Sequence, residues 1–154
     1  MSSTDIWVLC APKHASLEAQ RILSTLDLQP AWTPQPHTPG TLQARISCHL
    51  GDDQVAQLAS KFGQLGIAFE IQQMSHEPCL ILGHPGLGRR RLPLDSSGEA
   101  VVRMGRLESL MAEAAGSQAE LRRLLRLESG TAWLDLLEPY RLATPRVRNL
   151  PRAV

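Results

Sequence analysis

The chain has 154 residues, 43% of them hydrophobic and 20% charged, with a formal net charge of +1 at pH 7. This length suits one globular domain whose core needs no metal or disulfide, and the apolar fraction excludes a disordered chain. No apolar run reaches the roughly 18 residues of a membrane span, so none is expected. Three scattered cysteines, and an N-terminus without a basic segment followed by an apolar stretch, favour a cytoplasmic location.

Positive charge is concentrated in the second half of the chain. Residues 1–77 carry four basic and seven acidic side chains, whereas residues 78–154 carry twelve basic and eight acidic ones. The balanced total argues against bulk binding of nucleic acid. The basic second half is compatible with an acidic partner.

Residues 1–40 begin with a strand pattern followed by a helix pattern. Residues 5–10 indicate a strand, and residues 14–27 carry apolar side chains at the spacing of an amphipathic helix. Residues 28–33 are short and proline-bounded, which predicts an edge strand. Three prolines and a glycine predict an irregular loop over 34–40.

The clearest strand covers residues 41–50, where apolar and polar side chains alternate without a fault. This alternation predicts one buried and one polar face. Asp52 or Asp53 is expected to cap a helix that ends at Gly66, and a further strand covers 67–74. In the strand at 41–50, the side chains expected to point into the core are Leu42, Ala44, Ile46, Cys48 and Leu50.

The order strand, helix, strand, strand, helix, strand predicts an α+β fold with a ferredoxin-like βαββαβ core over residues 1–77. Its antiparallel sheet is expected to have helices on one face only. Trp7 and Leu9 would then point to the other face, where the C-terminal helices or another chain must cover them. The intramolecular cover is the favoured of these two alternatives.

The rest of the chain is expected to join this core in one compact unit. Residues 78–104 predict additional strands, one at 79–82 and a hairpin over 91–102 that turns at 95–98. Residues 105–154 predict three helices and an extended tail. Residues 117–120 form a capping-box pattern at the start of the second helix, and Pro139 is expected to end the third.

No metal or cofactor site is expected from the cysteines and histidines. The sequence has no C-x-x-C or H-x-x-x-H spacing, and Cys10 and Cys48 would lie on the order of 15 Å apart on neighbouring strands. Cys79 with His76 or His84 is the nearest approach to a nucleophilic pair, but no nucleophile elbow accompanies it. No catalytic residue is assigned, and an enzyme is disfavoured.

Two kinds of charged ligand, a small anion and RNA, can be weighed against the sequence. The glycine-rich stretch 83–88 leads into Arg89, Arg90 and Arg91, which predicts either a weak anion site or an edge strand protected by charge. RNA binding is disfavoured because Trp7 is the only aromatic residue on the open sheet face and no RNP-like motif is present.

The C-terminal segment is the predicted protein interface. If Pro139 ends the last helix, the chain leaves it as an arm with the aromatic and arginine composition of interface hot spots. Alternatively, this arm packs on the sheet as a lid over Trp7 and Leu9. The candidate interface residues are Trp133, Glu138, Tyr140, Arg141, Arg146 and Arg148.

Several segments in a fixed order resemble an actinobacterial family of unknown function. They include residues 32–36 (Trp-Thr-Pro-Gln-Pro), 39–42 (Pro-Gly-Thr-Leu), 130–135 (Gly-Thr-Ala-Trp-Leu-Asp) and 137–141 (Leu-Glu-Pro-Tyr-Arg). Residues 134–135 and 149–150 depart from the family pattern, which has an acidic pair and an aromatic residue there. The resemblance implies no reaction, but it implies a gene neighbourhood of fatty-acid synthase and acyl-CoA carboxylase.

The expected function is therefore a non-catalytic accessory or regulatory subunit. Its partner would be a protein of fatty-acid biosynthesis, with an acyl-CoA carboxylase complex first. The alternative is a regulatory module for a small ligand such as an acyl-CoA, a nucleotide or an amino acid. Ferredoxin-like modules bind such ligands at helix–strand loops, here near residues 11–14 and 83–88.

Overall fold

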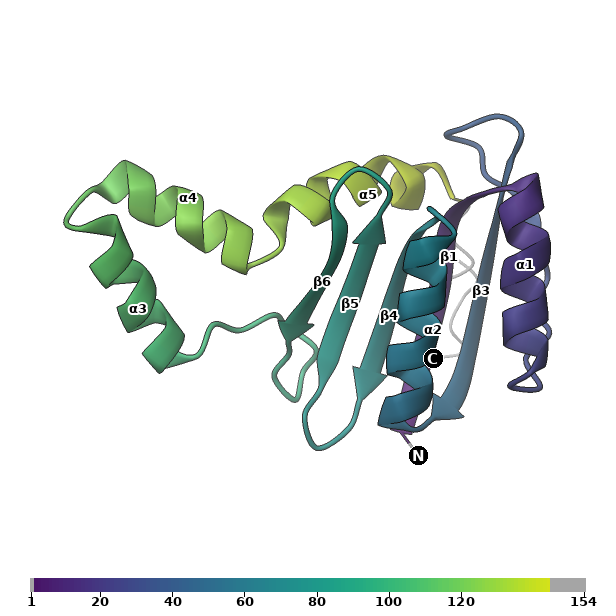
Figure 1. Cartoon of the computed structure of the whole chain (residues 1–154), viewed down its shortest axis with the longest axis horizontal. Helices are drawn as coiled ribbons and strands as arrows, with labels where there is room; N and C mark the ends of the chain where they lie inside the picture. The colour runs from purple at the N-terminus through teal and green to yellow at the C-terminus, as the bar shows by residue number, and fades with distance from the viewer. Residues whose placement is uncertain (1, 145–154) are drawn as a thin grey trace, which may run out of the picture.

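The computed structural model describes residues 2–144 of the chain (Figure 1). The first half contains β1 (Ser2–Pro12), α1 (Lys13–Ser24), β2 (Thr33–Pro34), β3 (Thr41–Leu50), α2 (Asp52–Gln64) and β4 (Ala68–Met74). The second half contains β5 (Cys79–His84), β6 (Gly88–Pro93), α3 (Met104–Ala114), α4 (Gln118–Glu128) and α5 (Thr131–Ala143).

The strands form one antiparallel sheet in the order β2-β3-β1-β4-β5-β6. Strands β5 and β6 extend the sheet that the first four strands begin, so residues 79–93 belong to the same layer. Over the described residues the chain is thus a mixed α/β structure with a six-stranded antiparallel sheet and five helices.

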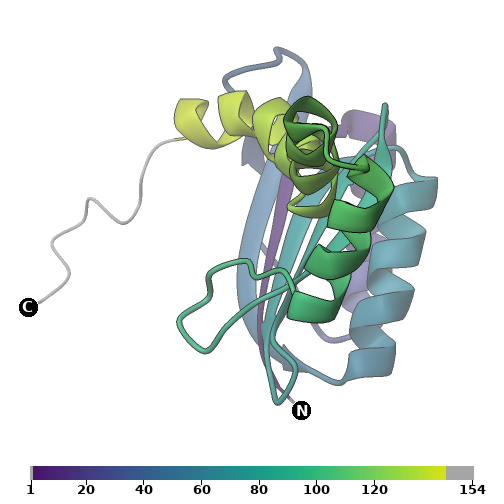
Figure 2. The same cartoon turned by 90° about the vertical axis from the view of Figure 1, so that its left-hand side faces the viewer.

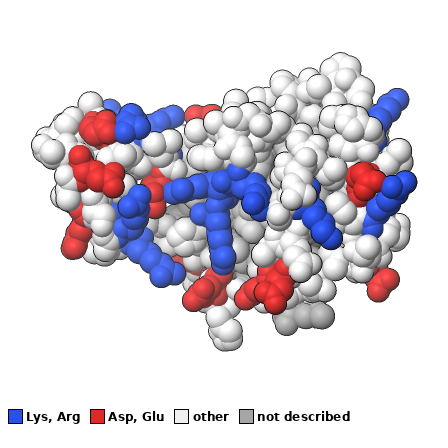
Figure 3. Space-filling model, in the orientation of Figure 1, with Lys and Arg blue, Asp and Glu red and all other residues white. Residues whose placement is uncertain are grey.

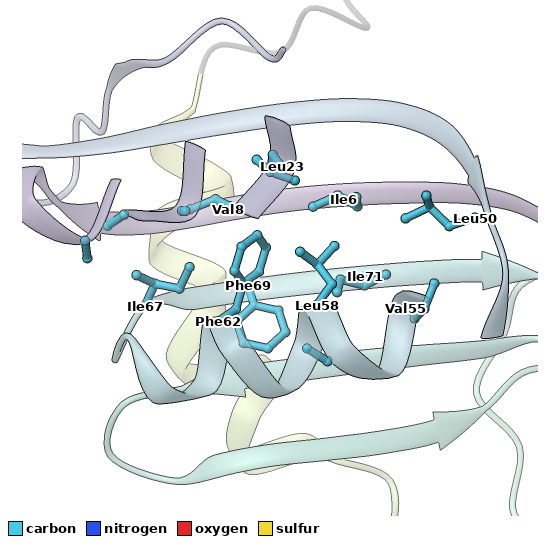
Figure 4. Packing of buried hydrophobic residues seen from close by; sticks show 14 residues of the cluster. Ile6, Val8, Leu23, Leu50, Val55, Leu58, Phe62, Ile67, Phe69 and Ile71 are labelled. Carbon is cyan, nitrogen blue, oxygen red and sulfur yellow. The ribbon is translucent and has the colours of Figure 1, made fainter. Parts of the chain in front are cut away.

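The main core lies between the sheet and the helices α1 and α2. The expected alternation of 41–50 is confirmed, because β3 spans Thr41–Leu50 and its inward residues Ile46, Cys48 and Leu50 pack in this core. Figure 4 shows Ile6 and Val8 of β1 facing Phe62 of α2 across the same space. Alternate strand positions and one stripe of each helix therefore bury a common apolar layer.

Gly83 of β5 allows an aromatic ring to lie flat on the sheet. A Cβ atom built at this position would lie 2.1 Å from Cε1 of Phe69 on the neighbouring strand β4. The Phe69 ring also contacts Phe62 edge to face, with the ring centroids 5.5 Å apart. A strand glycine is used here because two groups approach closely.

The second face of the sheet carries a smaller core under α5. This core buries Trp7 and Leu9 of β1 and Leu137 of α5, together with Leu82 and Leu92. The expectation that the C-terminal helices cover Trp7 and Leu9 is confirmed. The sheet therefore has helices on both faces, which corrects the expected one-sided arrangement.

A bulge in β1 explains the buried Gln35. The register of β1 against both neighbours shifts after Val8, which takes the Leu9 carbonyl out of the regular ladder. Nε2 of Gln35 donates a hydrogen bond of 2.6 Å to this oxygen. The proline-rich loop thereby satisfies a backbone group that the sheet leaves free.

Two local expectations were wrong, and a third was correct only in part. The edge strand expected at 28–33 is reduced to Thr33–Pro34, because Trp32 instead turns toward α1 and its Nε1 donates to Oε1 of Gln20 at 2.7 Å. Gly51 rather than an aspartate caps α2. The hairpin expected at 91–102 is present in part: the chain turns at 95–98, where the Gly98 amide donates to the Asp95 carbonyl at 3.1 Å, and Leu94 forms a bridge with Ala100. Its first strand, β6, already begins at Gly88.

The expected end of the last helix at Pro139 was also wrong. Helix α5 continues through Pro139 to Ala143, so Tyr140 and Arg141 are helical rather than an extended arm. Proline costs a helix one hydrogen bond, but contacts on both sides of it hold the helix together. Leu137 is fully buried before the proline, and Tyr140 packs on the same core after it.

None of the helices among residues 2–144 is long and apolar enough to cross a membrane.

Candidate functional site

The end of α5 is tied to the sheet by Tyr140 and Arg141. Arg141 forms an ion pair with Glu70 of β4 and a second one, at 3.5 Å, with Glu138. Tyr140 packs on the second core and meets the ring of His37 edge to face at 4.9 Å. Both side chains therefore serve intramolecular packing, which matches the lid alternative.

The other predicted interface residues have mixed surroundings. Trp133 is partly buried against the second core, and its Nε1 donates to the Gly88 carbonyl at 3.2 Å. Glu138 is about half exposed, with a side-chain accessibility of 51%. Arg146 and Arg148 lie outside the described residues. A role of Glu138 in binding a partner stays a prediction.

The three consecutive arginines of β6 divide between two environments. Because side chains alternate along a strand, Arg90 faces α4, where it pairs with Glu128 at 3.0 Å. Arg89 and Arg91 are exposed and have no acidic partner within 4.0 Å among the residues that the structure describes. Figure 3 shows the basic side chains that gather over the middle of this face of the molecule. Arg89 and Arg91 are thus the two exposed arginines of the three, and an anion site on this strand stays a prediction.

Helices α3 and α4 form a hairpin that stands beside the sheet rather than across it (Figures 1 and 2). Helix α3 packs on α4, and α4 packs on α5. Only Leu110 and Ala114 of α3 are buried, and α4 has no buried residue. We name this element the α3–α4 hairpin.

The α3–α4 hairpin exposes an apolar stripe that sequence reasoning missed. Met104 is 69% exposed and Met111 54%, and with the half-buried Leu107 between them they lie at i, i+3 and i+7 on one side of α3. The available signal was that six of the 11 residues of α3 are apolar, which is more than one packed face needs.

Glu128 fixes the α3–α4 hairpin to the sheet. Its carboxylate accepts hydrogen bonds from Arg106 of α3, at 3.0 and 3.3 Å, and lies 3.0 Å from Arg90 of β6. These bonds, the one from Arg106 first, hold the pKa of Glu128 below its usual value. Three elements thus meet at one carboxylate.

The cysteines and histidines named for nucleophilic or metal chemistry lie in different surroundings. Burial raises the pKa of the Cys79 thiol, so it stays protonated near neutral pH, and His84 is taken up by accepting a hydrogen bond from the Gly86 amide. Cys48 lies opposite Thr4 in the sheet, about 20 Å along β1 from Cys10. No group of three potential metal ligands occurs within residues 2–144.

A groove of about 430 Å³ lies where β5 and β6 meet the segment that leads to α3. The side chains of Arg91 and Arg103 line it together with His76 and the buried Cys79. Its apolar lining comes from Pro93, Leu94 and Val101, among others. The groove combines basic and apolar surface, which is typical of a site for a small ligand.

The described chain is an α+β protein with helices on both faces of an open antiparallel sheet and with one projecting helical hairpin. Residues 6–149 match the model of the family "Protein of unknown function (DUF3145)", and the chain belongs to this family. No curated protein and no solved structure matches it significantly. The resemblance to a family of unknown function is thereby confirmed.

Proposed function

We propose that this protein is a non-catalytic accessory or regulatory subunit, located in the cytoplasm, that binds another protein through the α3–α4 hairpin. The exposed apolar stripe of Met104, Leu107 and Met111 carries this proposal. Exposed methionines on a helix are typical of binding surfaces because the unbranched side chain adapts to its partner. The α3–α4 hairpin contributes few buried side chains, which supports a role in binding over a role in stabilising the fold.

The proposal includes a ferredoxin-like core that holds this hairpin in place. The order β2-β3-β1-β4, with α1 and α2 on one face, supports it. In this arrangement α5 locks onto the second face, and Glu128 sets the direction of the α3–α4 hairpin relative to the sheet.

The proposed partner is an enzyme of fatty-acid biosynthesis, with the acyl-CoA carboxylase complex first. The family resemblance supports this choice, because it implies that such chains are encoded beside these enzymes. The apolar stripe on the α3–α4 hairpin would bind a partner that has an apolar patch of similar size. The exposed Glu108 at the edge of the stripe would favour a partner with positive charge beside its apolar patch.

Affinity purification of the tagged chain from its native host tests this proposal. We expect the unaltered chain to recover the carboxylase or another biosynthetic enzyme, and Met104→Glu with Met111→Glu to reduce recovery at least about tenfold, since charge is introduced into an apolar interface. Leu17→Glu is the matched control, because Leu17 is 68% exposed on α1, on a different element. It should recover the partner unchanged.

Two results would contradict the proposal. One is recovery of the chain without any enzyme of lipid synthesis at native abundance and low salt. The other is equal recovery by the hairpin variant and the Leu17 variant, which would show that the stripe does not take part in binding.

A second candidate function is a regulatory module for a small ligand. The groove beside Arg91 and Arg103 favours it. Acyl-CoA, nucleotides and amino acids all carry the anionic groups that arginine binds. The groove lining includes neither residues 11–14 nor residues 83–88, so this candidate position differs from the two expected from the sequence.

A further inference from the structure

The groove beside β6 has an excess of positive charge. Arg91 comes from the edge strand and Arg103 from the residue before α3, and both are exposed. Neither has an acidic partner within 4.0 Å in the described part of the chain, whereas six other arginines there do. Glu77 is the one acidic residue in the lining, and the first turn of α3 contains none.

Besides the two arginines, Glu77 and His76, the lining of the groove consists of uncharged residues. Cys79 is 2% exposed, and its raised pKa keeps the thiol neutral. Pro93 and Leu94 continue from β6, and Val101 lies opposite, held by a backbone hydrogen bond of 3.0 Å from its amide to the Pro93 carbonyl. This bond fixes the apolar wall relative to Arg91, so the groove exists before a ligand arrives.

We infer that this groove binds a small organic anion in which a carboxylate or phosphate group is joined to a short apolar chain. The two guanidinium groups would bind the anionic head through charge-assisted hydrogen bonds, and the apolar part would lie on Leu94 and Val101. The volume falls in the usual range of about 300–1,000 Å³ for small-molecule sites. This inference deepens the second candidate function and does not depend on the α3–α4 hairpin.

Titration of the ¹⁵N-labelled full chain, followed by NMR, tests the inference with four probes. Hexanoate and hexyl phosphate carry both parts of the ligand, 1-hexanol only the apolar part, and inorganic phosphate only the head. We expect at least one hexyl anion to shift the amide signals of residues 76–79, 91–94 and 101–103 saturably. The tighter of the two identifies the head group. Hexanol and inorganic phosphate should each bind at least about tenfold more weakly, because each lacks one set of contacts.

Arginine variants show whether the site is specific. Arg91→Gln and Arg103→Gln should each weaken binding at least about tenfold, since each removes a charge-assisted contact. Arg89→Gln is the matched control, because Arg89 is exposed on the same strand but outside the groove lining. It should change affinity by no more than about twofold.

The inference is overturned if neither hexyl anion shifts these signals, or if hexanol binds as tightly as they do. It is also overturned if Arg89→Gln weakens binding as much as Arg91→Gln, since attraction would then be general to the basic surface. All three arginines are exposed, so the variants should keep their melting temperatures. The titration is independent of any protein partner, so its failure leaves the proposed accessory role standing.

Discussion

At the scale of single residues, Glu128 connects three elements of the fold. It lies at the end of α4 and joins Arg106 of α3 to Arg90 of β6. Its side chain is 21% exposed, and those of Arg90 and Arg106 are 33% and 46% exposed. Solvent screens the pair with Arg106 more, so we assign the whole junction only about 1 kcal/mol.

The pH dependence of stability should reveal this junction. Because the folded-state pKa of Glu128 is lowered, its contribution is complete above the ordinary glutamate pKa of about 4.3 and is lost as the pH falls through the folded-state pKa. We expect Glu128→Gln to reduce the free energy of unfolding by about 1 kcal/mol at neutral pH. The difference from the unaltered chain should shrink as the pH is lowered from about 5 toward about 2.

Urea unfolding at several pH values measures this difference. Glu108→Gln is the control, because Glu108 is exposed on α3 and has no ion pair among the described residues. It should stay within about 0.5 kcal/mol of the unaltered chain. If Glu128→Gln lowers the free energy of unfolding equally at every pH, the loss comes from poor packing of the amide. The missing charge would then not be its cause.

At the scale of elements, α5 shows what a local pattern can and cannot predict. A third helix before Pro139 followed from the sequence pattern, but its end did not, because the rule that proline ends a helix is local. The contacts that override the rule come from residues far away in the chain, such as Glu70 and His37. Tertiary packing here outweighs a missing backbone hydrogen bond.

The same distinction explains which other elements were predictable. The strand at 41–50 and the helix that begins at Asp52 carry their period in the sequence, because one face of each is buried in a common core. The two-residue strand β2 has no period to read. The groove at Arg91 and Arg103 unites residues that are twelve positions apart through a loop, so only the fold could bring them together.

We expect Leu137→Ala to destabilise the protein by about 2–5 kcal/mol, since a fully buried leucine leaves a cavity between α5 and the sheet. Leu136→Ala is the matched control one residue away, where the side chain is 42% exposed, and it should cost less than about 1 kcal/mol. Chemical denaturation with both variants measures the difference. Equal and small losses would show that α5 does not stabilise the second face.

At the scale of the whole molecule, the sheet and the α3–α4 hairpin differ in how many buried side chains hold them in place. Strand β1 lies in the middle of the sheet and contributes to both cores, with Ile6 and Val8 on one face and Trp7 and Leu9 on the other. The α3–α4 hairpin has only two buried side chains, and its link to the sheet depends on Glu128 and on α5. The sheet is thus packed on both faces, whereas few buried side chains hold the α3–α4 hairpin.

Hydrogen exchange should resolve these two parts. We expect the amides of α3 and α4 to exchange at least about tenfold faster, relative to their intrinsic rates, than those of β1 and β4, because local opening of the α3–α4 hairpin exposes little apolar surface. Glu128→Gln should increase exchange in α3 and α4 and leave β1 and β4 unchanged, since the carboxylate joins the hairpin to β6. Exchange measured by mass spectrometry on peptides from each element tests both statements. Equal protection of the hairpin and the central strands would contradict them, because it would mean that the hairpin opens only when the sheet unfolds.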